Sequence, residues 1–76
     1  MPLYRTPDGA EFLAASPAEL AEQLRESKFI PETTIASWMA ASAERARVLD
    51  VVLRTDTVEH HIQDMLDGGL LNLMDD

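Results

Sequence analysis

The sequence predicts an α+β fold in which a small antiparallel sheet packs against three helices. Two short apolar segments near the N-terminus flank a turn, and three later segments place apolar residues at helical spacing behind capping residues. Residues 48–54 alternate as a strand does. The expected order is therefore β-β-α-α-β-α. The length of 76 residues indicates a single domain over positions 1–76. A mostly helical bundle with a loose N-terminal hairpin is the alternative.

The first expected element is a β-hairpin. Leu3–Arg5 and Glu11–Leu13 flank residues 6–10, in which Pro7 fixes φ. The Asp-Gly pair at positions 8–9 supplies residues that tolerate positive φ. These features predict two antiparallel strands joined by a tight turn.

A capping box predicts the first helix, from residue 17 to about residue 27. Ser16 is the expected N-cap, Pro17 takes the first helical position and Glu19 reaches back to the N-cap amide. At 100° per residue, apolar and acidic side chains separate onto opposite faces. The expected core face holds Leu20, Ala21 and Leu24, and the acidic face holds Glu19, Glu22 and Glu26.

The segment before Pro31 ends this helix, because the residue that precedes a proline avoids the helical region. Phe29 and Ile30 are expected to enter the core. Thr33 or Thr34 caps the second and longest helix. Its apolar stripe consists of Ile35, Trp38, Met39, Ser42, Ala46 and Leu49. Its other side is rich in alanine and serine, which permits close approach of another backbone and equally favours the helix itself.

Residues 48–54 are rich in β-branched side chains and are expected to pair with the N-terminal hairpin as a strand, or to form a tight hairpin that turns at Asp50. The segment 56–59 repeats the capping arrangement, with Asp56 as the expected cap of a third helix. The Gly-Gly pair at 68–69 closes that helix by left-handed capping, and the apolar tail that follows docks on the body. The inward residues of the third helix are Val58, Ile62, Met65 and Leu66.

Composition narrows the classes of function. Fourteen acidic against six basic residues give a net charge of −8, which disfavours direct binding to nucleic acid or to anionic membranes and favours a protein partner with a basic surface. The absence of cysteine favours a reducing cytoplasm. No apolar run approaches the roughly 20 residues of a membrane span, and no signal sequence is predicted. A chain this short gains from pairing, so a homodimer stays open.

The adjacent His60 and His61 are the candidates for metal binding. His60 and Asp64 are four residues apart and share a helix face, as two ligands of a transition metal would. A zinc site needs three or four ligands and no third position stands out, so we assign no metal and no cofactor. His61 is expected to be half-buried. No serine or threonine has an evident histidine partner, so no catalytic residue is assigned and an enzyme is not expected.

The acidic helix faces are the candidate binding surface. Carboxylates three or four residues apart on a helix lie about 5–6 Å from one another, close to the charge spacing along one nucleic-acid strand. An acidic surface also keeps a small domain soluble, which is the plain alternative. The candidate partner-binding residues are Glu19, Glu22, Glu26, Glu59, Asp64 and Asp67.

Five short stretches carry a resemblance: YRTPDG at 4–9, SPAEL at 16–20, AERAR at 43–47, RTD at 54–56 and GLL at 69–71. In these the chain resembles small acidic proteins of phages and mobile elements, of which the anti-CRISPR proteins are the best characterised class. Several members of that class occupy the nucleic-acid channel or the motif-reading site of a CRISPR effector. They share no common motif, so the resemblance assigns no residue.

Two functional hypotheses follow. The first is a non-enzymatic, anti-CRISPR-like inhibitor in the cytoplasm of a host bacterial cell, whose acidic helix faces mimic DNA and bind the basic nucleic-acid groove of an effector complex. The second is a small accessory or scaffolding protein that binds a partner, or itself, through apolar surface on the alanine-rich second helix or the tail from Leu70 to Met74. The salt dependence of binding distinguishes the two hypotheses, because salt screens contacts between exposed charges and does not screen apolar contacts.

Overall fold

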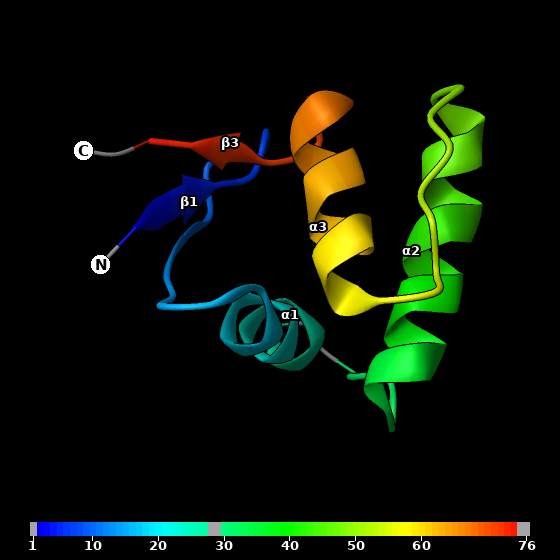
Figure 1. Cartoon of the computed structure of the whole chain (residues 1–76), viewed down its shortest axis with the longest axis horizontal. Helices are drawn as coiled ribbons and strands as arrows, with labels where there is room; N and C mark the ends of the chain where they lie inside the picture. Colours follow the sequence, from blue (N-terminus) through cyan, green and yellow to red (C-terminus); the bar gives the residue numbers. More distant parts are fainter. Residues whose placement is uncertain (1, 28–29, 75–76) are drawn as a thin grey trace.

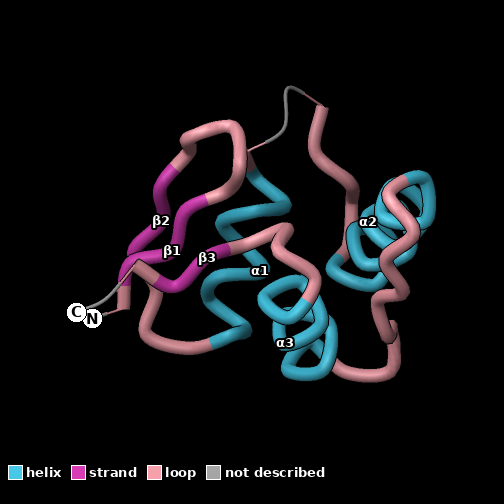
Figure 2. Tube along the Cα trace, turned by 90° about the horizontal axis from the view of Figure 1, so that it is seen from above, coloured by secondary structure: helices cyan, strands magenta, loops and turns pink. Residues whose placement is uncertain are grey.

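The computed structural model describes residues 2–27 and 30–74 and has the α+β architecture that the sequence predicts (Figure 1). The three-stranded sheet lies at one end of the molecule, α2 lies at the other, and α1 and α3 lie between them (Figure 2). No helix among the described residues is long and apolar enough to cross a membrane. In chain order the elements are β1 (Leu3–Arg5), β2 (Glu11–Leu13), α1 (Pro17–Glu26), α2 (Ile35–Val48), α3 (Val58–Asp67) and β3 (Asn72–Leu73).

The N-terminal hairpin forms as predicted. β1 and β2 pair antiparallel, with Tyr4 opposite Phe12. The turn closes with a hydrogen bond from the Thr6 amide to the Ala10 carbonyl at 2.9 Å. Gly9 has a φ of 98°, so its lack of a Cβ is what allows the turn.

The third strand is not where the sequence reasoning expected it. The sheet order is β2-β1-β3, and β3 consists of Asn72 and Leu73, which pair antiparallel with β1. Residues 51–55 are extended but form no strand. The predicted strand at 48–54 is therefore wrong in position, and the C-terminal tail supplies the third strand.

The end of α2 explains this difference. The helix continues through Val48, and the Asp50 and Val51 amides then donate to the carbonyls of Arg47 and Ala46, both at 3.0 Å. Asp50 has a φ of 64°, the left-handed conformation that closes a Schellman motif and that aspartate tolerates better than most residues. The β-branched residues of 48–54 therefore lie at the end of α2 and in the extended segment that follows it.

The alternation at 48–54 has a different cause from strand pairing. Leu53 is buried, whereas Val52 is 83% exposed, so successive side chains do point inward and outward. Leu53 joins the core and lines a hollow beside α2. An extended segment that covers a helix has the same period of two as a strand in a sheet.

The helices begin at side-chain caps, as the sequence predicts. Ser16 Oγ accepts from the Glu19 amide at 3.2 Å, and Thr34, one of the two candidates, caps α2. Thr57 rather than Asp56 caps α3, accepting from the His60 amide at 3.1 Å. Ser, Thr and Asp all serve as caps, and neighbouring candidates cannot be ranked locally.

The C-terminal end of α3 is a second Schellman motif. Gly69 has a φ of 78°, and the Leu70 amide donates to the Met65 carbonyl at 2.9 Å. The motif turns the chain back onto the body, so that Leu71 is fully buried before β3 begins. The expected docking of the tail is confirmed.

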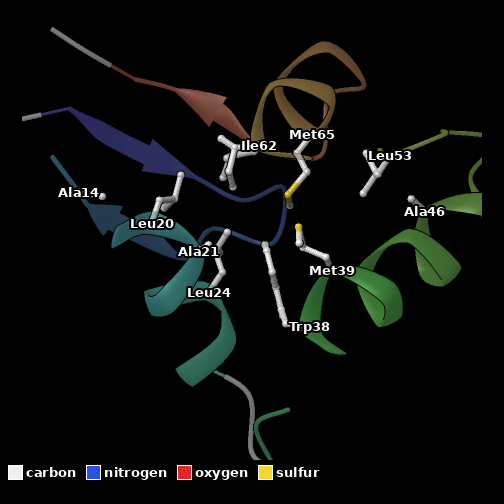
Figure 3. Packing of buried hydrophobic residues seen from close by; sticks show 11 residues of the cluster. Ala14, Leu20, Ala21, Leu24, Trp38, Met39, Ala46, Leu53, Ile62 and Met65 are labelled. Carbon is white, nitrogen blue, oxygen red and sulfur yellow. The ribbon is translucent and has the colours of Figure 1, made fainter. Parts of the chain in front are cut away.

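The core lies between the three helices (Figure 3) and holds the predicted inward residues of α1 and the central residues of α2 and α3. Two expectations are wrong: Ile30 is 77% exposed, and Leu49 is exposed because the helix has ended there. Phe29 lies outside the described residues. The buried apolar residues are Ala14, Leu20, Ala21, Leu24, Trp38, Met39, Ala46, Leu53, Ile62, Met65 and Leu71.

Candidate functional site

The three candidate carboxylates of α1 all have partners within the molecule. Glu19 accepts a hydrogen bond from the Ala15 amide at 2.6 Å, one residue before the amide expected for a capping box. Arg25 Nη2 lies 2.8 Å from Glu22 and 3.4 Å from Glu26. The side chains of Glu22 and Glu26 remain at least half exposed, and exposed ion pairs of this kind contribute little to stability.

Asp64 of α3 is not the outward residue that the helical spacing predicts. Its carboxylate accepts from the Arg54 amide at 2.8 Å and from the Arg54 guanidinium at 3.0 and 2.9 Å, and its side chain is only 15% exposed. Hydrogen bonds from Arg54 lower the pKa of Asp64 to about 2. Asp64 therefore ties the extended segment 51–55 to α3.

The other two candidates on α3 stay on the surface. Asp67 accepts a hydrogen bond from the Gln63 side chain at 3.0 Å. Glu59 is exposed, and within residues 2–27 and 30–74 its side chain contacts no hydrogen-bond or ionic partner. Of the six candidates, Glu59 is thus the one with no competing contact in the described structure.

The histidines have separate environments. His60 Nδ1 lies 3.0 Å from Asp56 Oδ2, so its acidic neighbour is not Asp64. Taken over the described residues, no group of three histidine, cysteine, aspartate or glutamate side chains could hold a metal ion. The printed contacts of Asp64 are with Arg54, so each member of the proposed pair has a different partner.

His61 is fully buried rather than half-buried. Its Nδ1 lies 2.7 Å from the Arg54 carbonyl, which can only accept, so the neutral ring carries its proton on Nδ1. Its Nε2 is buried without a hydrogen-bond partner, and the Trp38 ring packs against it edge-on with centroids 5.0 Å apart. Burial lowers the pKa of His61. These contacts fit a neutral core histidine.

A different surface emerges at the C-terminal end of α2. Val48, Leu49 and Val52 are 86%, 63% and 83% exposed. Single exposed apolar residues are ordinary, but three within five positions at one helix terminus make a candidate contact region. We call these three residues, with the two hollows described next, the α2 patch. Sequence reasoning missed it because it placed residues 48–54 in a sheet.

Two open hollows flank α2 at this patch. The first, of about 280 Å³, lies between α2 and the extended segment, and the second, of about 310 Å³, lies between α2 and the end of α3. Val52 lines the first and Leu49 lines the second. The remaining lining residues are Ala40, Ala43, Glu44, Arg47, Leu53 and Thr55 for the first, and Ser42, Arg45, Ala46, Met65 and Leu70 for the second.

Comparison with known proteins adds no relative. No family model matches the chain, and neither the curated proteins nor the solved structures contain a significant match.

Proposed function

We propose that this chain is a small non-enzymatic accessory protein that binds a protein partner through the α2 patch. The observation that carries the proposal is the exposure of Val48, Leu49 and Val52 at the end of α2, where Val52 lines one open hollow and Leu49 lines another. A domain of this size needs its apolar side chains for its own core, so leaving three of them in water costs stability that a contact would recover.

The arrangement of the fold also supports an interaction role. α2 forms one end of the molecule, and its outer side presents small residues such as Ala36 and Ala40. Small side chains let another backbone approach closely. The patch thus lies beside a helix surface of small exposed side chains, which leaves room for the backbone of a partner.

The test is a pull-down from cell lysate with the tagged chain, washed at low and then high salt. Val48→Ser with Val52→Ser should abolish capture of a partner that the wild type retains at high salt, because apolar contacts are not screened. Leu73→Ser is the matched control, since Leu73 is 55% exposed at the opposite end of the molecule. Equal capture by wild type and the double variant would overturn the proposal.

The same set of variants is used to measure whether the chain associates with itself. Sedimentation equilibrium of the wild type and the Val48→Ser, Val52→Ser variant shows whether the patch joins two copies. A dimer that the double substitution dissociates would identify the partner as a second copy of this chain.

A second candidate function is the anti-CRISPR-like DNA mimic. Its support is the net charge of −8 together with carboxylates that stay exposed on α1 and α3, of which Glu59 has no competing contact. It requires a basic nucleic-acid groove on an effector complex as the partner. Against it stand the internal contacts of the other five candidate carboxylates.

Matched single reversals test the mimic. Glu59→Lys and Glu44→Lys change the net charge equally, but only Glu59 belongs to the proposed acidic faces. If the mimic holds, the wild type displaces DNA from a CRISPR effector in a salt-sensitive manner, and Glu59→Lys weakens this far more than Glu44→Lys. Equal weakening would indicate a non-specific effect of charge, and no displacement would exclude the mimic.

A further inference from the structure

The described arginines divide into two groups. Arg5, Arg25 and Arg54 each lie within 3.0 Å of a carboxylate oxygen of Glu11, Glu22 and Asp64 respectively. In the part of the chain that the structure describes, Arg45 has no carboxylate partner, and Arg47 has only Glu44 at 3.5 Å, with both side chains at least 70% exposed. The two guanidinium groups left without a close partner belong to α2 alone.

These two arginines line the hollows of the α2 patch. Arg47 lines the first hollow with Val52, and Arg45 lines the second with Leu49. At 100° per residue, positions 45 and 47 lie about 160° apart around the helix, so the hollows are on opposite sides of α2. Each hollow therefore combines one exposed aliphatic side chain with one available cation.

We propose that the α2 patch binds an acidic amphipathic segment of a partner protein, an inference that rests on the proposed function. Aliphatic side chains of that segment enter the two hollows, and its carboxylates pair with Arg45 and Arg47. Guanidinium groups bind carboxylates in two-point hydrogen bonds, which makes arginine the suitable residue for this recognition. The partner segment proposed for this patch is therefore acidic, whereas the net charge of the chain alone predicts a partner with a basic surface.

The hollow volumes support a peptide segment rather than a small molecule. Of the two volumes, about 280 Å³ lies just below and about 310 Å³ lies at the bottom of the roughly 300–1,000 Å³ that small-molecule sites occupy. The hollows also lie on two sides of one helix, so a single small ligand cannot fill both. A longer chain segment that wraps around the end of α2 could reach both hollows.

The overall negative charge does not prevent this contact. Charges are screened over about 8 Å at physiological ionic strength, and the molecule measures 30 × 25 × 23 Å. Glu44 lines the first hollow, and Asp50, which follows Leu49 in the chain, lines neither. Glu44 competes with an incoming carboxylate for Arg47, so removing its charge should strengthen binding.

The test is selection of phage-displayed random 16-residue peptides on the folded chain, with counter-selection on the Val48→Ser, Val52→Ser variant. The proposal expects enriched peptides to combine aspartate or glutamate with leucine, isoleucine or phenylalanine. A selected peptide should bind Arg45→Glu, Arg47→Glu at least about tenfold more weakly, equal to about 1.4 kcal/mol. Glu44→Gln should bind it more tightly.

A charge swap separates recognition from loss of structure. The selected peptide with its acidic residues replaced by lysine should bind the Arg45→Glu, Arg47→Glu variant and not the wild type. Patch-dependent peptides without acidic enrichment would overturn the acidic-partner inference and leave the proposed function standing. If no enriched peptide depends on the patch, both proposals fail.

Discussion

The buried tail offers the sharpest test of how this small domain is held together. Leu71 is fully buried, although it lies five residues from the C-terminus and just before β3. Truncating a buried leucine to alanine costs about 2–5 kcal/mol, through lost transfer energy and the cavity left behind. A domain of 76 residues has roughly 4–11 kcal/mol of total stability. Leu71→Ala should therefore remove about a fifth of it or more.

The measurement is urea unfolding followed by fluorescence of Trp38, the only tryptophan and a buried one. A loss of about 2.5 kcal/mol corresponds to a fall in Tm of about 10–20 °C for a domain of this size. Leu73→Ala is the matched control in the same tail, and because Leu73 is 55% exposed it should cost less than about 1 kcal/mol.

The reasoning is refuted if both substitutions shift the unfolding midpoint equally, or if Leu71→Ala costs less than about 0.5 kcal/mol. Either result would mean that the tail covers the core without belonging to it. A changed slope of the unfolding curve for Leu71→Ala alone would instead show that the variant alters the denatured or native ensemble.

Three further predictions concern single polar residues. Burial lowers the pKa of His61, so its effect on the free energy of unfolding should be constant above about pH 6.5, and stability should fall as the pH decreases from 6.5 toward the folded-state pKa. Urea unfolding of the wild type and of His61→Phe at pH 7.5 and 5.5 checks this. The variant should lose this pH dependence. The pKa of Asp64 is lowered to about 2, so its stabilising contribution is present above about pH 3.8 and is lost as the pH falls toward 2. Asp64→Asn should lower Tm at pH 7 and reduce the dependence of Tm on pH in the acid range, measured by circular dichroism. An unchanged Tm would show that the contact with Arg54 is not stabilising. Asp50→Gly should leave stability unchanged or raise it by up to about 1 kcal/mol, because glycine adopts positive φ without strain, whereas Asp50→Ala should lower stability. Thermal unfolding of the two variants measures the difference. A less stable glycine variant than alanine variant would contradict the left-handed conformation of Asp50.

The acidic faces of α1 and α3 were only partly predictable from the sequence. The sequence places carboxylates on the solvent side of α1 and α3, but Asp64 shows why spacing is insufficient. Its helix position is outward by the 3.6-residue period, yet Arg54 from another segment covers it. A pairing between residues ten positions apart depends on the path of the intervening loop, which no local pattern encodes.

The α2 patch was missed for a related reason. Alternating apolar residues at 48–54 predict a strand, and a strand would have covered them in a sheet. The only local sign against it is Asp50, whose left-handed conformation ends the helix after Val48. Leu49 and Val52 are exposed because the chain then crosses α2 and does not pair with β1.

Local patterns were enough to predict the hairpin turn with its Asp-Gly pair, the cap Ser16 and the apolar stripes that form the core. These depend on interactions between residues a few positions apart, so a single stretch of sequence contains the needed information. The position of the third strand at Asn72 and Leu73, by contrast, follows from how the whole chain packs. The tertiary structure also decided which charges remain available, because burial and pairing over long sequence separations depend on how all the elements pack together.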